Sequence, residues 1–193
     1  YQEVGYNALL DEIKRKLSEL KKTDAALGYE MLGKAIQGLN LIYPYTTPIT
    51  NPSLLYGQTG LKNTMIFSKK NTNFKYKNTI LQEYGRIFSL PEIRKYSSKM
   101  SAIMHRIKKS EGIILIYSQF INAGCIPLAL ALEEMGIKRY GRKSLFKTPP
   151  HPPIDYRTMG IEPPHGDENE IIPATYAMIT GDHSLSPNKN KNE

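Results

Sequence analysis

Apolar residues recur at helical spacing in the first part of the chain and predict amphipathic helices. In residues 6–22 the apolar positions alternate steps of four and three, with charged residues between them: Tyr6, Leu10, Ile13, Leu17 and Leu20. A second helix is predicted from Thr23 or Asp24 to about Ile42. We expect the first helix to pack against its own domain, and its spacing also permits a short coiled coil.

Two further helices are predicted before residue 110. Pro91 fits the first turn of a short helix over residues 90–94. Ser97 or Ser98 is the expected N-cap of a longer helix, in which the apolar residues lie at i, i+3, i+4 and i+7: Met100, Ile103, Met104 and Ile107. His105 lies off this apolar stripe, so we expect it at the surface.

The pattern changes after Gly112, where a continuous apolar run covers Ile113–Tyr117 and ends at Ser118-Gln119. Such a run predicts a buried parallel strand with a polar tip. Residues 126–136 are apolar on several sides and end at a glycine, which predicts a helix with Glu133 and Glu134 on its exposed side. Strand, polar loop and helix form half of a βαβ unit.

The last third of the chain predicts two more strands separated by a long loop. Residues 137–140 are expected to form a short strand, and residues 175–180 an apolar strand that ends at Gly181-Asp182. Seven of the 13 prolines fall in residues 141–173, which we expect to be an inserted loop. Ser186-Pro187 predicts the start of another helix. The predicted fold class is α/β.

The pattern of predicted elements and the composition divide the chain into four parts. They are a helical segment (1–43), a Pro-rich linker (44–61), a basic aromatic-rich segment (62–110) and an α/β lobe (111–193). We also expect the chain to be a fragment of a longer protein, because it begins at Tyr1 and ends in a polar run.

The charge of +8 is concentrated between Lys62 and Lys109, where 12 Lys or Arg residues accompany two acidic residues. A concentrated cationic segment favours a polyanionic partner, most often nucleic acid, although solvated faces of ordinary proteins look similar. Aromatic residues are interleaved with these cations: Phe67, Phe74, Tyr76, Tyr84, Phe88 and Tyr96. They could stack on bases, or they could belong to the core and leave the lysines solvated.

Several kinds of chemistry can be discounted. Residues 57–64 have the residue types of a phosphate loop but not its spacing. The histidines show no metal-ligand spacing, and Ser118 lacks the flanking glycines of a nucleophile elbow. The lone Cys125 suits a reducing compartment, and no apolar run approaches the ~18 residues of a membrane span. We therefore expect a soluble intracellular protein with no membrane partner.

Two predicted strands end in small polar residues, at Ser118-Gln119 and at Thr180-Gly181-Asp182. Because the carboxyl ends of parallel strands meet at one edge of a sheet, these residues predict an edge suited to a sugar-phosphate backbone. Ordinary capping is the alternative role of Ser118 and Thr180.

Residues 111–120, EGIILIYSQF, resemble the opening strand of the second RecA-like lobe in superfamily 2 helicases and Swi2-type translocases, the segment called motif IV. Residues 176–184, YAMITGDHS, resemble the next strand and its turn in that lobe. The amino-acid sequence over residues 96–140 and 174–188 is most similar to the helicases of large nucleocytoplasmic DNA viruses.

The resemblance implies a partial RecA-like parallel sheet with flanking helices, preceded by the helical segment. It also implies an ATP-dependent helicase or translocase whose partners are DNA or RNA and the first lobe of the same protein. In that family the loops after these two strands grip a nucleic-acid strand through its backbone. By resemblance, the residues of this chain that would contact the nucleic-acid backbone are Ser118, Gln119, Thr180, Gly181 and Ser184. Lys189 is added to them because it lies near the position where many relatives have an arginine.

The resemblance implies ATP and Mg²⁺ as cofactors of the whole protein, although this chain lacks the phosphate loop, the acidic magnesium motif and the arginine finger. We therefore expect the chain alone to bind neither cofactor and to be catalytically inactive. A viral origin would imply the host cytoplasm, a viral factory or the virion as location. Two alternatives stay open: a non-catalytic nucleic-acid-binding module that uses residues 62–109, and a protein-interaction domain built on helix 6–22.

Overall fold

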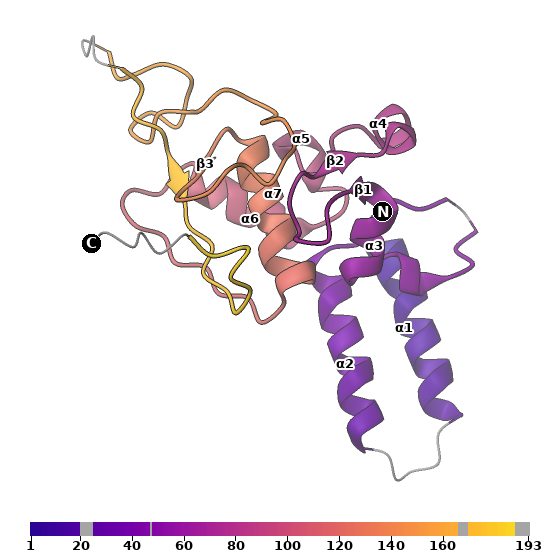
Figure 1. Ribbon diagram of the computed structural model, residues 1–193. Coiled ribbons are helices and arrows are strands. Elements are labelled where there is room, and N and C mark those ends of the chain that lie inside the picture. Colours follow the sequence, from indigo (N-terminus) through magenta and orange to yellow (C-terminus); the bar gives the residue numbers. More distant parts are fainter. Residues whose placement is uncertain (20–24, 47, 166–169, 188–193) are drawn as a thin grey trace.

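The computed structural model describes residues 1–19, 25–46, 48–165 and 170–187 (Figure 1). Helices dominate these ranges, accompanied by two short two-stranded sheets. In chain order the elements are α1 (Gln2–Ser18), α2 (Ala25–Asn40), the 3-10 turn η1 (Pro52–Leu54), α3 (Gly57–Thr64), β1 (Met65–Ile66), β2 (Lys75–Tyr76), α4 (Asn78–Tyr84), α5 (Leu90–Ile93), α6 (Ser98–Ile107), the π-helical turn η2 (Ile121–Cys125), α7 (Ile126–Glu134), β3 (Lys138–Arg139) and β4 (Thr175–Tyr176).

The first two helices form an antiparallel hairpin that projects from the rest of the chain (Figure 1). Leu9 and Ile13 of α1 pack with Met31 of α2 in a small hydrophobic cluster. Both predicted helices are confirmed, although α1 already begins at Gln2. The predicted N-cap of the second helix, Thr23 or Asp24, lies outside the described residues.

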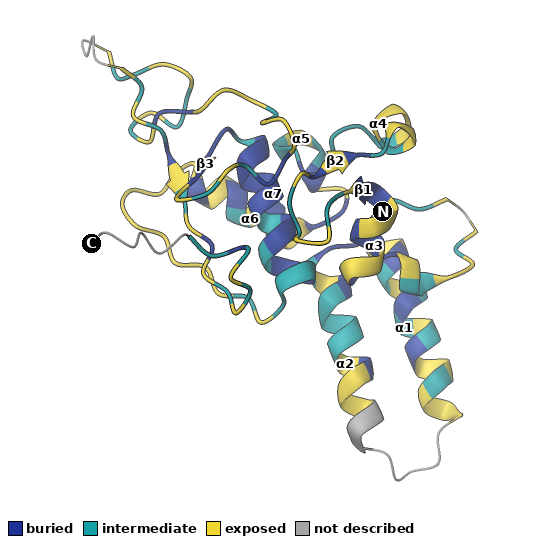
Figure 2. Cartoon of the chain, in the orientation of Figure 1, coloured by how far each residue is buried: buried dark blue, intermediate teal, exposed yellow. Residues whose placement is uncertain are grey.

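The main hydrophobic core surrounds α7, which contacts α5, α6 and β3 (Figure 2). Ile126 and Leu130 of α7 are fully buried there. The predicted helices over residues 90–94 and 98–107 are confirmed as α5 and α6. Ser97 caps α6 because its hydroxyl accepts a hydrogen bond from the Met100 amide at 3.0 Å, and His105 is exposed as predicted.

The two sheets differ in the direction of their strands. β1 and β2 pair antiparallel, and Phe74 beside β2 forms a parallel bridge with Phe146. β3 and β4 pair in parallel, with Lys138 opposite Thr175. The strands predicted at residues 137–140 and 175–180 are therefore present in short form, and the fold is a mixture of helices and small sheets.

The prediction of a buried strand at Ile113–Tyr117 is wrong for this structure. These residues have no regular secondary structure, and no hydrogen bond between backbone groups reaches residues 112–117 within the described chain. The exposed fractions of the five side chains alternate along the run: 103%, 43%, 94%, 39% and 87%. A buried strand needs a neighbouring strand and an apolar layer over each face, and the β3–β4 pair supplies neither to this segment.

The two segments predicted to be irregular contribute to the core. Within residues 44–61, η1 and the first half of α3 are regular, and Leu55 and Leu61 are buried. Within the described part of residues 141–173, Phe146 belongs to the main core and Ile154 to a second cluster beside Leu132 of α7. The four-part division of the chain stays a prediction.

Candidate nucleic-acid interface

Ser118 and Gln119 form a tight polar turn before η2. The Ser118 hydroxyl donates to the Phe120 carbonyl oxygen at 3.1 Å and accepts from the Phe120 amide at 3.3 Å. The Ser118 side chain is half-buried by these contacts, whereas Gln119 is exposed. Gln119 is thus the residue of the pair whose side chain is presented to solvent.

The first turn is fixed from behind by η2. A Cβ atom on Gly124 would lie 2.1 Å from the Ser118 hydroxyl oxygen, so only glycine permits this close approach. The Asn40 amide donates to the Ala123 carbonyl oxygen at 3.3 Å, and the Lys99 ammonium donates to the Asn40 side-chain oxygen at 2.7 Å. Lys99 on α6 is thereby linked through Asn40 to η2, the element that follows the turn.

The second predicted turn, Thr180–Ser186, is held by its own hydrogen bonds. The Thr180 hydroxyl accepts from the Asp182 amide and donates to the Asp182 carbonyl oxygen, both at 3.1 Å. Ser186 closes the turn, because its hydroxyl donates to the Thr180 carbonyl oxygen at 3.0 Å. The Asp182 carboxylate accepts from the Ser184 hydroxyl at 2.7 Å and from its amide at 2.8 Å, which lowers the pKa of Asp182.

Two arginines bind the carbonyl groups of this turn. Arg139 of β3 is buried and donates to the Leu185 carbonyl oxygen at 2.6 Å. Arg142 donates to the carbonyl oxygens of His183 at 2.7 Å and Ser186 at 2.8 Å. The turn is therefore attached to β3 and the residues after it, and its exposed Gly181 has space around the backbone.

The two turns are not joined directly in this structure. Within the described ranges, no hydrogen bond or ion pair connects residues 118–119 with residues 180–184. The first turn lies against Gly124 of η2, which is bonded to α2, whereas the second contacts the segment after β3. Lys189 lies outside the described residues, as does any helix that starts after Ser186-Pro187.

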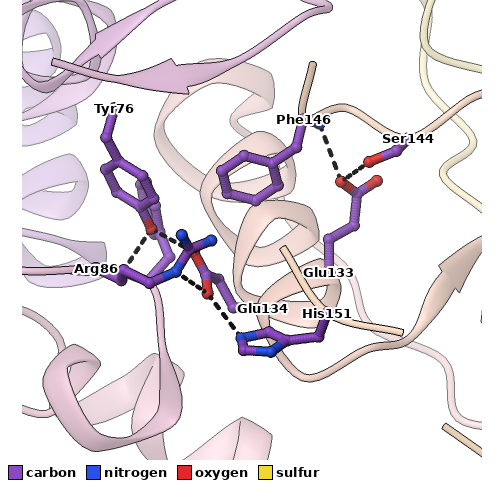
Figure 3. A network of polar contacts seen from close by, with 8 residues as sticks. Tyr76, Arg86, Glu133, Glu134, Ser144, Phe146 and His151 are labelled. Atoms are coloured by element: carbon purple, nitrogen blue, oxygen red, sulfur yellow. Dashed lines mark hydrogen bonds and ion pairs between the residues drawn. The ribbon is translucent and has the colours of Figure 1, made fainter. Parts of the chain in front are cut away.

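Sequence reasoning missed a buried polar network around the carboxylates of Glu133 and Glu134 on α7 (Figure 3). Glu133 accepts hydrogen bonds from the amides of Leu145 and Phe146, at 2.7 and 3.1 Å, and from the Ser144 and Tyr176 hydroxyls, at 2.5 and 2.8 Å. Glu134 accepts from the Tyr76 hydroxyl at 2.7 Å and twice from Arg86, at 2.9 Å each.

The prediction that Glu133 and Glu134 are exposed is therefore wrong: their residues are 4% and 5% accessible. A buried carboxylate is tolerated only when donors satisfy its oxygens, and both side chains have them. Burial next to these anions also raises the pKa of Tyr76 and Tyr176. A signal was present in the sequence, because a helix that is apolar on all sides is a buried helix and buries its acids too.

The network holds four distant segments around one helix. Tyr76 comes from β2, Arg86 from the loop after α4, Ser144 from the segment after β3 and Tyr176 from β4. His151 also approaches Glu134, with its Nε2 atom 3.6 Å from the carboxylate. The role of this group is structural: it positions β4, and through β4 the Thr180–Ser186 turn.

The aromatic residues of the basic segment lie mostly inside the protein. Phe74, Tyr76, Phe88 and Tyr96 are at most 3% exposed, and Phe67 stacks on Phe74 with ring centroids 4.6 Å apart. The lysines between them are largely solvated, since Lys62, Lys69, Lys70 and Lys75 are exposed. This segment therefore offers positive charge to a partner, but its buried rings offer no stacking platform.

Comparisons with known proteins give no relative. The chain matches no protein family, no curated protein and no solved structure. In the part of the chain that the structure describes, no helix is long and apolar enough to cross a membrane, and no group of three or more His, Cys, Asp or Glu residues could hold a metal ion.

Proposed function

We propose that this chain is part of the second lobe of an ATP-dependent helicase or translocase and grips the sugar-phosphate backbone of DNA or RNA. The observation that carries the proposal is the parallel pairing of β3 with β4, which leads into the polar Thr180–Ser186 turn. Small hydroxyl side chains and backbone amides beyond a parallel strand are the groups that contact phosphates without reading sequence.

The segment Ile113–Tyr117 supports a larger sheet in the complete lobe. Its exposure alternates with a period of two, the arrangement of a strand whose successive side chains point to opposite sides. Its backbone groups form no hydrogen bond with other backbone groups among the described residues, so the segment is available to a neighbouring strand. We propose that this segment joins a RecA-like parallel sheet when further strands of the lobe are present.

We assign ATP and Mg²⁺ to the rest of the proposed protein, because the two features of this chain that could suggest a nucleotide or metal site do not fit one. The stretch that resembles a phosphate loop forms α3, and a Cβ atom on Gly60 would lie 2.2 Å from the Tyr43 ring. Glu133 and Glu134 already accept four and three hydrogen bonds respectively, so they are not free to bind a metal ion.

A binding titration tests this proposal. The chain is titrated with a labelled oligothymidylate of about 16 nucleotides, the upper end of single-strand site sizes, at about 50 and about 200 mM salt. We expect weak, salt-sensitive binding that decreases when Gln119→Ala and Thr180→Ala are combined. The matched control is Thr180→Ser, which keeps the hydroxyl that bonds Asp182 and should preserve binding.

Each outcome discriminates between the hypotheses. Binding that the Gln119→Ala, Thr180→Ala variant leaves unchanged favours the non-catalytic module that uses the basic segment. No binding at the lower salt concentration contradicts both nucleic-acid hypotheses. It would leave protein interaction through the α1–α2 hairpin, where Leu17, Tyr29 and Leu32 are 44%, 76% and 55% exposed.

A further inference from the structure

The β1–β2 hairpin reaches the Thr180–Ser186 turn, although the two segments are far apart in the sequence. The Ser184 hydroxyl oxygen lies 3.2 Å from the Lys70 carbonyl oxygen, across 114 positions of the chain. The single hydroxyl proton of Ser184 is shared between this carbonyl and the Asp182 carboxylate. The contact places Lys69 and Lys70, at the tip of the hairpin, next to the turn.

Hydrogen bonds hold the hairpin tip that carries these lysines. The Ser68 amide donates to the Thr72 carbonyl oxygen at 2.9 Å, and the hydroxyls of the same two residues lie 2.8 Å apart. Asn71 and Asn73 adopt positive φ angles of 51° and 59°, a conformation that asparagine tolerates in tight turns. Below the tip, the Phe74 amide donates to the Leu145 carbonyl oxygen at 2.8 Å, which ties the hairpin to the core.

Cationic residues from two other segments are brought to the turn by the contacts of Ser184 and Arg142. Lys69 and Lys70 are exposed, and within the described residues neither forms an ion pair. Arg142, from the segment after β3, binds the His183 and Ser186 carbonyl oxygens. The acid of the turn, Asp182, accepts hydrogen bonds from Ser184 and forms no ion pair with either lysine among the described residues. The two lysines therefore keep their charge available for an external anion.

We propose that Lys69 and Lys70 bind phosphates of the nucleic-acid strand that lies against the Thr180–Ser186 turn. This inference rests on the proposed function and assigns its cationic contacts. A backbone-binding site needs cations beside its hydroxyls and amides, because phosphate charge supplies most of the sequence-independent affinity. The β1–β2 hairpin supplies them from a segment that precedes the α/β part of the chain.

The test compares two double variants with the same change in charge. Lys69→Ala with Lys70→Ala removes the proposed contacts, and Lys108→Ala with Lys109→Ala removes two exposed lysines at the end of α6. Two lost phosphate contacts should lower the slope of log affinity against log salt by about 1.4, since each contact on a single strand contributes about 0.7. We expect this decrease in slope for the Lys69→Ala, Lys70→Ala variant and a smaller decrease for the Lys108→Ala, Lys109→Ala variant.

Acetylation of lysines in the unmodified chain gives an independent readout. With the oligothymidylate bound, Lys69 and Lys70 should react more slowly, and Lys108 and Lys109 at their original rates. Two results would overturn this inference: an equal effect of both double variants, or no protection of Lys69 and Lys70 from acetylation in the complex. The proposed function would still stand in either case, provided that Gln119→Ala with Thr180→Ala weakens binding. An absence of binding contradicts both.

Discussion

Arg86 and Glu134 form an ion pair with two hydrogen bonds between the loop after α4 and the last turn of α7. The Nε and Nη2 atoms of Arg86 each lie 2.9 Å from a carboxylate oxygen, 48 residues away in sequence. The Glu134 side chain is fully buried, whereas the Arg86 side chain is 40% exposed. The arginine therefore covers and neutralises a carboxylate that lies inside the core.

Arg86→Ala should lower the free energy of unfolding by about 2–3 kcal/mol, because it leaves the buried Glu134 charge without its cation. The expected loss is below that for a fully buried pair, since Arg86 is partly exposed and Tyr76 still donates to Glu134. Urea denaturation measures the change. Arg94→Ala is the control, because Arg94 is exposed and makes no ion pair in the described part of the chain, and it should have almost no effect.

A double variant separates the ion pair from general packing. Arg86→Met with Glu134→Leu removes both charges and keeps similar volume, so it should be more stable than Arg86→Ala alone. If Arg86→Ala is as stable as the unmodified chain, Glu134 is not buried beside Arg86 as described.

Asp155 predicts a pH dependence of stability. Its buried carboxylate accepts hydrogen bonds from the Arg157 guanidinium and amide and from the Ile172 amide, and Arg157 lowers the pKa of Asp155. Because the pKa of Asp155 is lower in the folded state, its carboxylate stabilises the folded protein fully at pH values above the unfolded-state pKa near 3.8. This contribution is lost as the pH falls through the lower folded-state pKa.

Asp155→Asn should therefore lower the melting temperature at pH 7. The difference from the unmodified chain should shrink as the pH falls below about 4, because Asp155 then takes up a proton in the unfolded chain while it stays ionised in the folded one. Thermal unfolding followed by circular dichroism between pH 3 and 7 measures it. A difference that is the same at every pH would mean that the carboxylate charge does not act in this way.

Local patterns were sufficient to predict α1, α2, α5, α6 and α7, whereas α3 and α4 were not predicted. Spacing of apolar residues and capping by Ser97 depend on neighbours within one or two turns, and both are present in the sequence. Gly136 has a φ of +85°, as expected for the glycine that follows a helix. The strands at β3 and β4 were predicted for similar reasons, because β-branched and apolar residues stand between turn residues.

Features that depend on distant residues could not be predicted. The environment of Glu134 is set by Tyr76 and Arg86, which are 58 and 48 positions away. The contact of Ser184 with Lys70 spans 114 positions. The exposure of Ile113–Tyr117 depends on whether another strand lies beside it, which no local pattern records.

Two helical glycines give opposite predictions for the same substitution. Gly60→Ala should destabilise the protein by about 1–3 kcal/mol, because the new Cβ atom would lie 2.2 Å from the Tyr43 ring and 3.0 Å from the Leu55 backbone. Gly33→Ala has no atom within 4 Å of its Cβ and should stabilise α2 by about 0.5–1 kcal/mol. Chemical denaturation of both variants measures the difference, and equal effects would contradict the close packing of α3 on Tyr43.

The alternating exposure of residues 113–117 predicts that neighbouring apolar residues differ in their importance. Ile113 and Leu115 are 103% and 94% exposed, so replacing both by serine should change the free energy of unfolding by less than about 0.5 kcal/mol. Ile114 and Ile116 are 43% and 39% exposed, and the same double replacement should cost about 1–2 kcal/mol through lost apolar burial.

The first double variant should also reduce self-association. Ile113 and Leu115 expose apolar surface along an unpaired backbone, which is the type of segment that pairs with a second copy. Light scattering as a function of protein concentration measures the effect, with Ile114→Ser plus Ile116→Ser as the matched control. If Ile113 and Leu115 prove more important for stability than the less exposed Ile114 and Ile116, the segment packs in the opposite orientation, and the strand proposed for the complete lobe presents its other face to the core.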